Sequence, residues 1–284
     1  MAPTPQPRSF TLSHAHIRRP SAGSLPRSAR YTVALAGNPN TGKSTVFNAL
    51  TGLRQHTGNW PGKTVTLAEG VYAHRGVAHR VVDLPGTYSL FAASPEEEVA
   101  RDFICFGGAD VVIAVTDATC LERNLNLVLQ IAEVTPRIVV CLNLMDEAKR
   151  KGITIDVDQL SSELGLPVVP TVARTGRGIV ELMDAVLDVA SGRVSTRPVR
   201  ISYGPDVEAI IAEIEPDLTA LASDAGLKIS PRWLALRMID GEPGLVATLG
   251  RILCDARPHD ARPPSNAPSN DAAQSVAGKG GMPA

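Results

Sequence analysis

The stretch GNPNTGKS at residues 37–44 decides the fold of this 284-residue chain. It fits the pattern G-x-x-x-x-G-K-[ST], follows the apolar run 31–36 and opens a helix-length segment at Lys43. Glycines let the backbone wrap closely around a phosphate, and a helix N-terminus adds partial positive charge. Lys43 is predicted to bridge the β- and γ-phosphate oxygens, and the Ser44 hydroxyl to ligate Mg²⁺. The pattern and its context predict a nucleoside triphosphate site.

Short apolar runs alternate with helix-length segments on both sides of this loop. The expected strands are residues 31–36, 80–83, 111–116, 137–142 and 167–171. The expected helices are residues 43–50, 95–106, 121–134, 156–164 and 178–190. Continuous apolar runs suit strands buried on both faces, and the intervening helices imply crossover connections. We therefore expect an α/β domain over residues 31–192, with a mostly parallel sheet flanked by helices.

A small all-helical subdomain is expected over residues 200–254, after a polar linker at 191–200. Ser230 is the predicted N-cap of one helix, with Pro231 at its first position. A further helix is expected before the one capped by Ser230, and Pro216 should end or kink it. Residues 245–253 suggest a third helix. About 55 residues are few for independent stability, so the subdomain is expected to lean on the α/β domain.

The two ends of the chain differ in composition from the rest. Residues 1–30 contain no Asp or Glu, but five Arg, five Pro and five Ser. They are predicted to form a disordered basic arm, and residues 255–284 a disordered tail. An organelle transit peptide shares the composition of the arm, although the prolines would break the amphipathic helix that such peptides need.

Composition excludes several classes of protein. The net charge is −1, so nothing draws the whole chain to nucleic acid, and no nucleic-acid partner is expected. No apolar run approaches the roughly 18–20 residues needed to cross a bilayer, so no membrane span is expected in this chain. The four scattered cysteines suit reduced thiols better than a disulfide framework.

Two further motifs extend the phosphate loop. The sequence DLPG at residues 83–86 ends an expected core strand, so Asp83 can hold Mg²⁺ through water and Gly86 offers an N–H to a γ-phosphate. The sequence NLMD at residues 143–146 follows another strand. There the Asp146 carboxylate can accept hydrogen bonds from guanine N1–H and the 2-amino group, donors that adenine lacks. The order of the motifs predicts recognition of guanine.

A fifth, weaker element is TVARTG at residues 171–176. It could present the backbone N–H of Ala173 to the guanine oxygen. Two positions depart from common GTPase patterns: Leu144 stands where many have lysine, and Val172 where many have serine. At position 144, an apolar side chain must therefore take over the packing against the base. The detailed contacts of the fifth loop stay open.

In this order, the motifs identify the chain as a translation-factor-type small GTPase. More narrowly, it resembles the cytosolic GTPase domain and helical spacer domain of the bacterial ferrous iron transport protein B family, over about residues 31–250. The stretches that carry the resemblance are 37–53, GNWPGKTV at 58–65, VDLPGTYSL at 82–90, 94–102, 143–146 and 203–235.

The resemblance implies roles that the residues alone do not. Thr64 resembles the first-switch threonine that ligates Mg²⁺ when GTP is bound. Asn40 resembles an asparagine that helps to hold K⁺ beside the phosphates, where the cation would neutralise developing charge. Thr87 stands where Ras-like proteins carry a water-orienting glutamine, so intrinsic hydrolysis is expected to be slow. Lys43, Thr64 and Asn40 are the expected catalytic residues.

The expected ligands are GTP or GDP, Mg²⁺ and possible K⁺. Expected nucleotide contacts come from Gly37, Asn38, Asn40, Thr41, Gly42, Lys43, Ser44, Thr45, Gly86, Asn143, Asp146 and Ala173. The expected metal ligands are Ser44, Thr64 and Asp83 for Mg²⁺, and Asn40 for K⁺.

The resemblance implies a GTP-hydrolysing switch at the cytoplasmic face of the bacterial inner membrane, coupled to ferrous iron uptake. Its expected partner is a membrane-embedded iron permease domain or subunit, because family members continue into a polytopic membrane domain. Residues 54–66 and 87–98 are the expected switches. Two alternatives stay open: a GTPase of ribosome assembly or tRNA modification, and a nucleotide-sensing interaction module. Fe²⁺ ligation could be proposed for His14 and His16, for residues 96–98 and for the cysteines. Each set has a simpler explanation: a disordered pair, a helix N-terminus and core packing, respectively.

Overall fold

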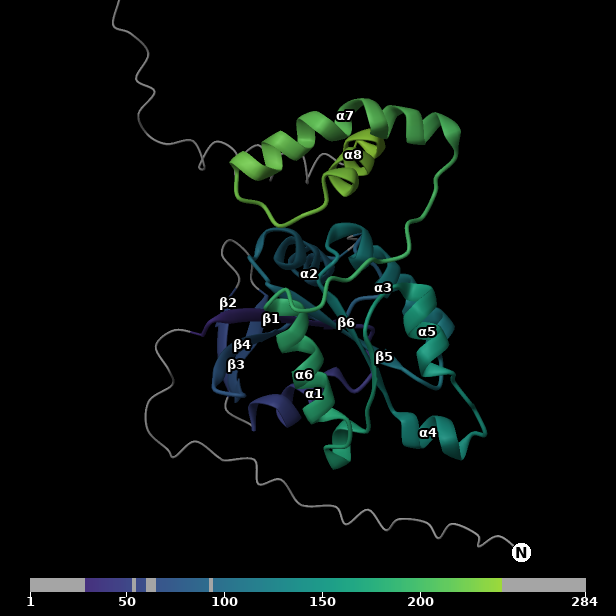
Figure 1. The fold of residues 1–284 in the computed structure, drawn as a ribbon. Helices are drawn as coiled ribbons and strands as arrows, with labels where there is room; N and C mark the ends of the chain where they lie inside the picture. Colours follow the sequence, from purple (N-terminus) through teal and green to yellow (C-terminus); the bar gives the residue numbers. More distant parts are fainter. Residues whose placement is uncertain (1–28, 53–54, 60–64, 92–93, 242–284) are drawn as a thin grey trace, which may run out of the picture.

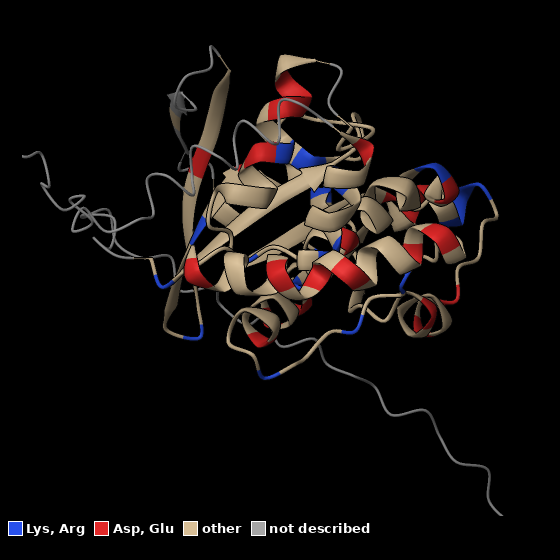
Figure 2. Ribbon diagram, turned by 90° about the horizontal axis from the view of Figure 1, so that it is seen from above, with Lys and Arg blue, Asp and Glu red and all other residues tan. Residues whose placement is uncertain are grey.

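The computed structural model describes residues 29–52, 55–59, 65–91 and 94–241 (Figure 1). The expected basic arm, apart from its last two residues, lies outside the described residues. So do Thr64, the expected third helix at 245–253 and the C-terminal tail. Lys and Arg are interspersed with Asp and Glu over the described elements (Figure 2), as the near-zero net charge suggests.

A seven-stranded sheet forms the centre of the described structure, in the order β2-β3-β4-β1-β5-β6-β7. The strands are β1 (Tyr31–Gly37), β2 (Gln55–Asn59), β3 (Thr66–His74), β4 (Val77–Asp83), β5 (Val111–Asp117), β6 (Ile138–Asn143) and β7 (Val168–Pro170). Strand β1 pairs in parallel with β4 and β5, and the order continues in parallel through β6 and β7. The predicted mostly parallel sheet is confirmed.

Two antiparallel strands at one edge, β2 and β3, were not expected from the sequence. Strand β3 has the sequence TLAEGVYAH, in which Glu69 and Gly70 interrupt any apolar run. Its buried residues, Leu67, Gly70 and Tyr72, do not form the continuous stretch that marks the central strands. A pattern built on continuous apolar runs therefore overlooks this hairpin.

Helices cover both faces of the sheet (Figure 1). Helices α1 (Lys43–Thr51) and α6 (Ile179–Ala190) pack on one face, and α2 (Pro95–Phe106) and α3 (Leu121–Val134) on the other. Helix α5 (Val157–Leu164) follows α4 (Met145–Arg150). The short helix α4 was not expected from the sequence. The five predicted helices are present.

The core is split by the sheet into two layers because strand side chains alternate between faces. On β1, Val33 and Leu35 lie in the layer beneath α1 and α6, while Ala34 and Ala36 lie in the layer beneath α2 and α3. These residues are almost wholly buried. Burial on both faces explains why the central strands are apolar throughout.

The helical subdomain contains α7 (Pro205–Asp224) and α8 (Pro231–Asp240) in its described part. The predicted cap of α8 is confirmed, because Ser230 Oγ accepts a hydrogen bond from the Trp233 N–H. Of the two outcomes expected at Pro216, an end or a kink, the end is wrong: the helix continues for two more turns, to Asp224. Pro216 and Ala212 are exposed, so water can satisfy the carbonyl that proline leaves without a donor, while buried Ile211 and Leu218 anchor α7 on either side.

The subdomain packs against the α/β domain above α2 and α3 (Figure 1). Ile211, Trp233 and Leu234 belong to the same apolar cluster as Leu127 and Ile131 of α3. The Ser230 N–H also donates to the carbonyl of Val134, at 2.7 Å. The two parts therefore share one hydrophobic layer.

The linker between the two parts is tied to the end of α5. The Arg197 N–H donates to the Gly165 carbonyl at 3.1 Å, and the Val199 N–H to the Leu164 carbonyl at 3.0 Å. Gly165 has a φ of 65°, and a Cβ there would overlap the Arg197 carbonyl. Glycine is needed at this position both for its conformation and for the close approach of the linker.

We expect Gly165→Ala to lower the free energy of unfolding by about 2–3 kcal/mol, because the linker must move away. Urea denaturation measures the change. The matched control is Gly152→Ala, since Gly152 has a φ of 71° but no atom within 4 Å of its Cβ position. That variant should lose only the left-handed backbone cost of about 1 kcal/mol. Equal losses in the two variants would show that the linker contact is without energetic weight.

Candidate nucleotide site

The phosphate-loop pattern lies between β1 and α1, at the carboxyl edge of the sheet. Gly37 ends β1, and a Cβ there would lie 2.6 Å from the Val115 carbonyl oxygen. Gly42 has a φ of 80°, and its Cβ would overlap the side-chain amide of Asn143. Asn40 is exposed and also has a positive φ, 67°. The loop therefore needs glycine at both ends, where β5 and the Asn143 side chain of β6 approach it closely.

Lys43 and Asp83 form an ion pair beneath this loop. Lys43 begins α1, and Asp83 ends β4, which lies beside β1 in the sheet. Their side chains are only 11% and 14% exposed. Burial raises the pKa of Asp83, and Lys43 opposes that shift. The structure thus brings together the lysine predicted for phosphate and the carboxylate predicted for Mg²⁺.

Asn38 supplies an unpartnered polar group inside the loop. Its side chain is 2% exposed, and neither Nδ2 nor Oδ1 has a hydrogen-bond partner among the described residues. Burying an amide without partners is costly, so such a group is characteristic of a place where a ligand binds. Ser44 and Thr45 are exposed in the first turn of α1, where hydroxyl oxygens suit Mg²⁺. The residues present fit a phosphate group with its Mg²⁺.

Asn143, at the end of β6, joins three loops through its buried side chain. Its Nδ2 donates to the Thr41 carbonyl of the phosphate loop at 3.0 Å. Its Oδ1 accepts from Thr171 Oγ1 at 3.2 Å and from the Ala173 N–H at 3.1 Å. The Ala173 N–H that we expected to face guanine therefore bonds Asn143 in this structure. Asn143 therefore holds the phosphate loop together with the loops that follow β6 and β7.

Asp146 lies in the first turn of α4, with its side chain 33% exposed. Arg174 Nη2 donates to Asp146 Oδ2 at 3.1 Å. Leu144, before the helix, is half-buried with a φ of 61°. The sequence analysis did not predict this contact of Arg174. The available signal was a cationic residue directly after Ala173 in the fifth loop.

The segment after Gly86 lies against the phosphate loop. The Thr87 N–H donates to the Gly37 carbonyl at 3.2 Å, and a Cβ added at Gly86 would lie 3.4 Å from Pro39. Thr87 is 1% exposed, with its Oγ1 2.5 Å from the Ser89 carbonyl and 3.1 Å from Glu97 Oε1. Its hydroxyl therefore stabilises the turn.

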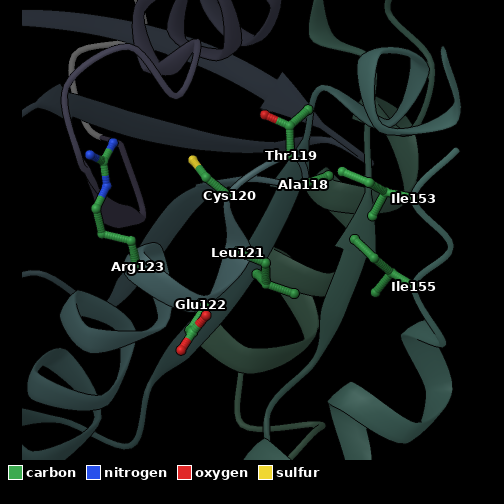
Figure 3. Close-up of a pocket in the computed structure, with 8 residues that line it drawn as sticks. All are labelled: Ala118, Thr119, Cys120, Leu121, Glu122, Arg123, Ile153 and Ile155. Carbon is green, nitrogen blue, oxygen red and sulfur yellow. The ribbon is translucent and has the colours of Figure 1, made fainter. Parts of the chain in front are cut away.

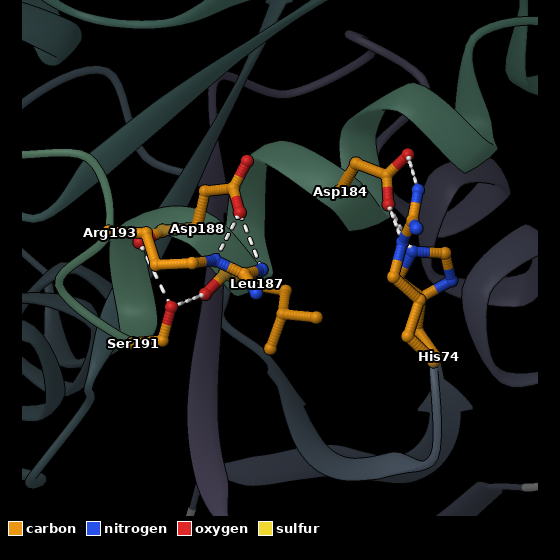
Figure 4. A network of polar contacts seen from close by, with 7 residues as sticks. His74, Asp184, Leu187, Asp188, Ser191 and Arg193 are labelled. Atoms are coloured by element: carbon orange, nitrogen blue, oxygen red, sulfur yellow. Dashed lines mark hydrogen bonds and ion pairs between the residues drawn. The ribbon is translucent and has the colours of Figure 1, made fainter.

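Two other features lie away from these motifs. A cavity of about 340 Å³ is lined by residues 118–123 and by Ile153 and Ile155 (Figure 3). A polar network joins His74 to Asp184 at 2.6 Å, beside a pair between Asp188 and Arg193 (Figure 4). Hydrogen bonds from Arg75 and His74 lower the pKa of Asp184 to about 2. This network ties the β3–β4 hairpin to α6.

No group of three or more His, Cys, Asp or Glu side chains that could hold a metal occurs among the residues described. His14, His16 and Cys254 lie outside them, and residues 96–98 form the first turn of α2. Within the same ranges, no helix is long and apolar enough to cross a bilayer.

The phosphate loop between β1 and α1, Asp83 at the end of β4, and Asn143 with Asp146 after β6 define a P-loop GTPase fold with an attached helical domain. Two family models match the chain: "Ferrous iron transport protein B" at residues 31–186, and "FeoB cytosolic helical domain" at residues 203–267. The chain belongs to the ferrous iron transport protein B family.

Relatives and solved structures agree with this assignment. The Fe(2+) transporter FeoB of Salmonella typhimurium is 41% identical over 217 residues, which cover 75% of this chain and 27% of the transporter. A Porphyromonas gingivalis FeoA/FeoB fusion protein is 42% identical over 216 residues, or 25% of its length. The chain thus spans about a quarter of the curated relatives that it matches.

The cytosolic domain of Thermotoga maritima FeoB in a GDP form has a TM-score of 0.68 and 40% identity, covering 78% of this chain and 85% of that one. The cytosolic domain of Legionella pneumophila FeoB has the same TM-score at 34% identity, covering 81% and 90%. The Thermotoga domain has also been solved in a GMPPNP form. These structures support nucleotide binding by this fold.

Proposed function

We propose that this chain is the Mg²⁺-dependent, GTP-hydrolysing switch of a ferrous iron uptake system. The observation that carries the proposal is the buried Asn143 side chain, which joins the phosphate loop to both base-recognition loops. One residue thereby couples the position of the phosphates to the position of the base. The Asp146 carboxylate would accept hydrogen bonds from guanine N1–H and the 2-amino group.

Hydrolysis would proceed by in-line attack of water on the γ-phosphate. Lys43 would leave Asp83 to bridge the β- and γ-phosphate oxygens, where it neutralises developing charge. Ser44, Thr64 and Asp83 would hold Mg²⁺, with Asp83 acting through water. Mg²⁺ held by these residues would supply electrostatic stabilisation of the phosphate oxygens. The Gly86 N–H would donate to the γ-phosphate.

Residues 54–66 and 87–98 would be the switches that respond to the γ-phosphate. The contacts of Thr87 with Gly37 and Glu97 support this role for the second segment, since they lie between the phosphate loop and α2. Threonine offers no carboxamide to orient water. We therefore propose a slow intrinsic rate, with water positioned by the backbone or by a bound K⁺.

The potassium proposal rests on Asn40, which is exposed at the tip of the phosphate loop. We expect GTP hydrolysis to be about tenfold faster in K⁺ than in Na⁺, because a cation beside the phosphates stabilises the transition state. Asn40→Ala should remove that difference and leave the rate in Na⁺ unchanged. Phosphate release measured in each salt provides the test. Equal rates of the unsubstituted protein in K⁺ and Na⁺ would contradict the proposal.

The enzymatic proposal is tested by measuring phosphate release from GTP and ATP, with Mg²⁺ and with excess EDTA. We expect phosphate release only in the sample that contains both GTP and Mg²⁺. Comparable release from ATP would contradict guanine recognition, and release in EDTA would contradict the Mg²⁺ requirement.

The proposed partner is a membrane-embedded iron permease, present either as the rest of a longer chain or as a separate subunit at the cytoplasmic face of the inner membrane. The share of the transporter relatives that this chain covers supports this proposal. Uptake of radioactive ferrous iron should require GTPase-competent protein. Uptake that is unchanged in cells carrying a hydrolysis-deficient variant would contradict the coupling.

A further inference from the structure

Arg174 and Asp146 form an ion pair between two segments of the chain that are hydrogen-bonded to one another. Arg174 lies in the short 3₁₀ turn Ala173–Thr175, and Asp146 in the first turn of α4. The backbone of the turn is anchored next to Arg174, because the Ala173 N–H bonds buried Asn143. Next to Asp146, the Met145 N–H donates to the Thr171 carbonyl at 3.3 Å. The distance of 3.1 Å between Arg174 Nη2 and Asp146 Oδ2 therefore joins two side chains carried by anchored backbones.

This contact occupies an atom that the proposed function needs. Guanine presents two donors to the carboxylate, N1–H and the 2-amino group, so both oxygens of Asp146 are required. In this structure Oδ2 accepts from Arg174. Each carboxylate oxygen can accept two hydrogen bonds, so Arg174 and the base would share Oδ2, and the guanidinium would weaken that oxygen as an acceptor for the base.

We propose that Arg174 competes with the guanine base for Asp146 and thereby slows nucleotide capture. The proposal rests on the proposed function, since it assigns a specificity-tuning role at the same site. When the base binds, it competes with Arg174 for Oδ2, and Arg174 is free to move into solvent, where its side chain is already 77% exposed. Loss of the pair frees Oδ2 before the base arrives, so we expect it to accelerate association and to leave dissociation unchanged.

The expected effect is modest, since both partners are partly solvated. Exposed ion pairs of this kind correspond to about a two- to fivefold change in an equilibrium or rate constant. The effect should shrink as ionic strength rises, because salt screens the pair. The direction of the change in association rate distinguishes competition from simple electrostatic attraction. If Arg174 only attracted the negatively charged nucleotide, its removal would slow capture.

The test is stopped-flow binding of fluorescent GDP to Arg174→Ala. We expect association about two- to fivefold faster at low ionic strength, a smaller difference at high salt, and an unchanged dissociation rate. The matched control is Arg177→Ala, which removes an exposed arginine three residues further along the same loop. It should bind no faster than the unsubstituted protein.

A double-mutant cycle isolates the pair. In an Asp146→Asn background probed with fluorescent XDP, Arg174→Ala should have no effect on association. Unchanged or slower association in the single Arg174→Ala variant, or faster dissociation with unchanged association, would overturn the competition and indicate a structural clamp. Failure of the unsubstituted protein to bind GDP would overturn the proposed function and, with it, this inference.

Discussion

Asp146→Asn is expected to change the base that the protein accepts from guanine to xanthine. The carboxylate accepts two hydrogen bonds from guanine, and an asparagine amide would place a donor opposite one of guanine's donors. Xanthine carries a carbonyl at position 2, which matches that donor. A site built around specific hydrogen bonds rejects a mismatched base strongly.

We expect the preference for GTP over XTP to reverse, with each affinity changing by roughly 10²–10³-fold. The affinities for GTP and XTP are measured by competition against fluorescent GDP or XDP. The variant should hydrolyse XTP at about the rate at which the unsubstituted protein hydrolyses GTP, because the phosphate loop is untouched. The control is Asp158→Asn, an exposed carboxylate on α5. Retained GTP preference in Asp146→Asn would contradict base recognition by this residue.

Lys43→Ala is expected to reduce GTP hydrolysis by roughly 10²–10³-fold, in the range found when one electrostatic stabiliser is removed from a buried site. The lysine is the positive charge that the structure places at the phosphate loop, paired with Asp83. Its loss also leaves the Asp83 carboxylate without its counter-charge in a largely buried position. Nucleotide binding should therefore weaken together with the chemical step.

Single-turnover phosphate release and direct titration with fluorescent GTP separate the two effects in Lys43→Ala. Lys149→Ala is the matched control, because Lys149 is an exposed lysine at the end of α4. It should retain full activity. Hydrolysis by Lys43→Ala within about twofold of the unsubstituted rate would contradict the proposed role.

The sequence predicted the central strands and most helices because their signals are local. Val33 to Ala36 form a continuous apolar run since both faces of β1 are covered, and Ser94 and Ser230 mark helix starts by capping them. The β2–β3 hairpin lacks such a run. Helix α4 is only six residues long, too short to show a periodic pattern. An end of the helix, one of the two outcomes expected at Pro216, is overridden by the packing of Ile211 and Leu218.

The candidate site divides in the same way. By itself, the sequence determined the phosphate-loop pattern and the order of the motifs, and it predicted Asp146 as the carboxylate for the base, because each is a short stretch whose chemistry follows from neighbouring residues. Only the tertiary structure decided that Asn143 joins Thr41 to Ala173 and that Arg174 pairs with Asp146. Those contacts join residues 28–102 positions apart. They form because parallel strands place the loops at their carboxyl ends along one edge of the sheet.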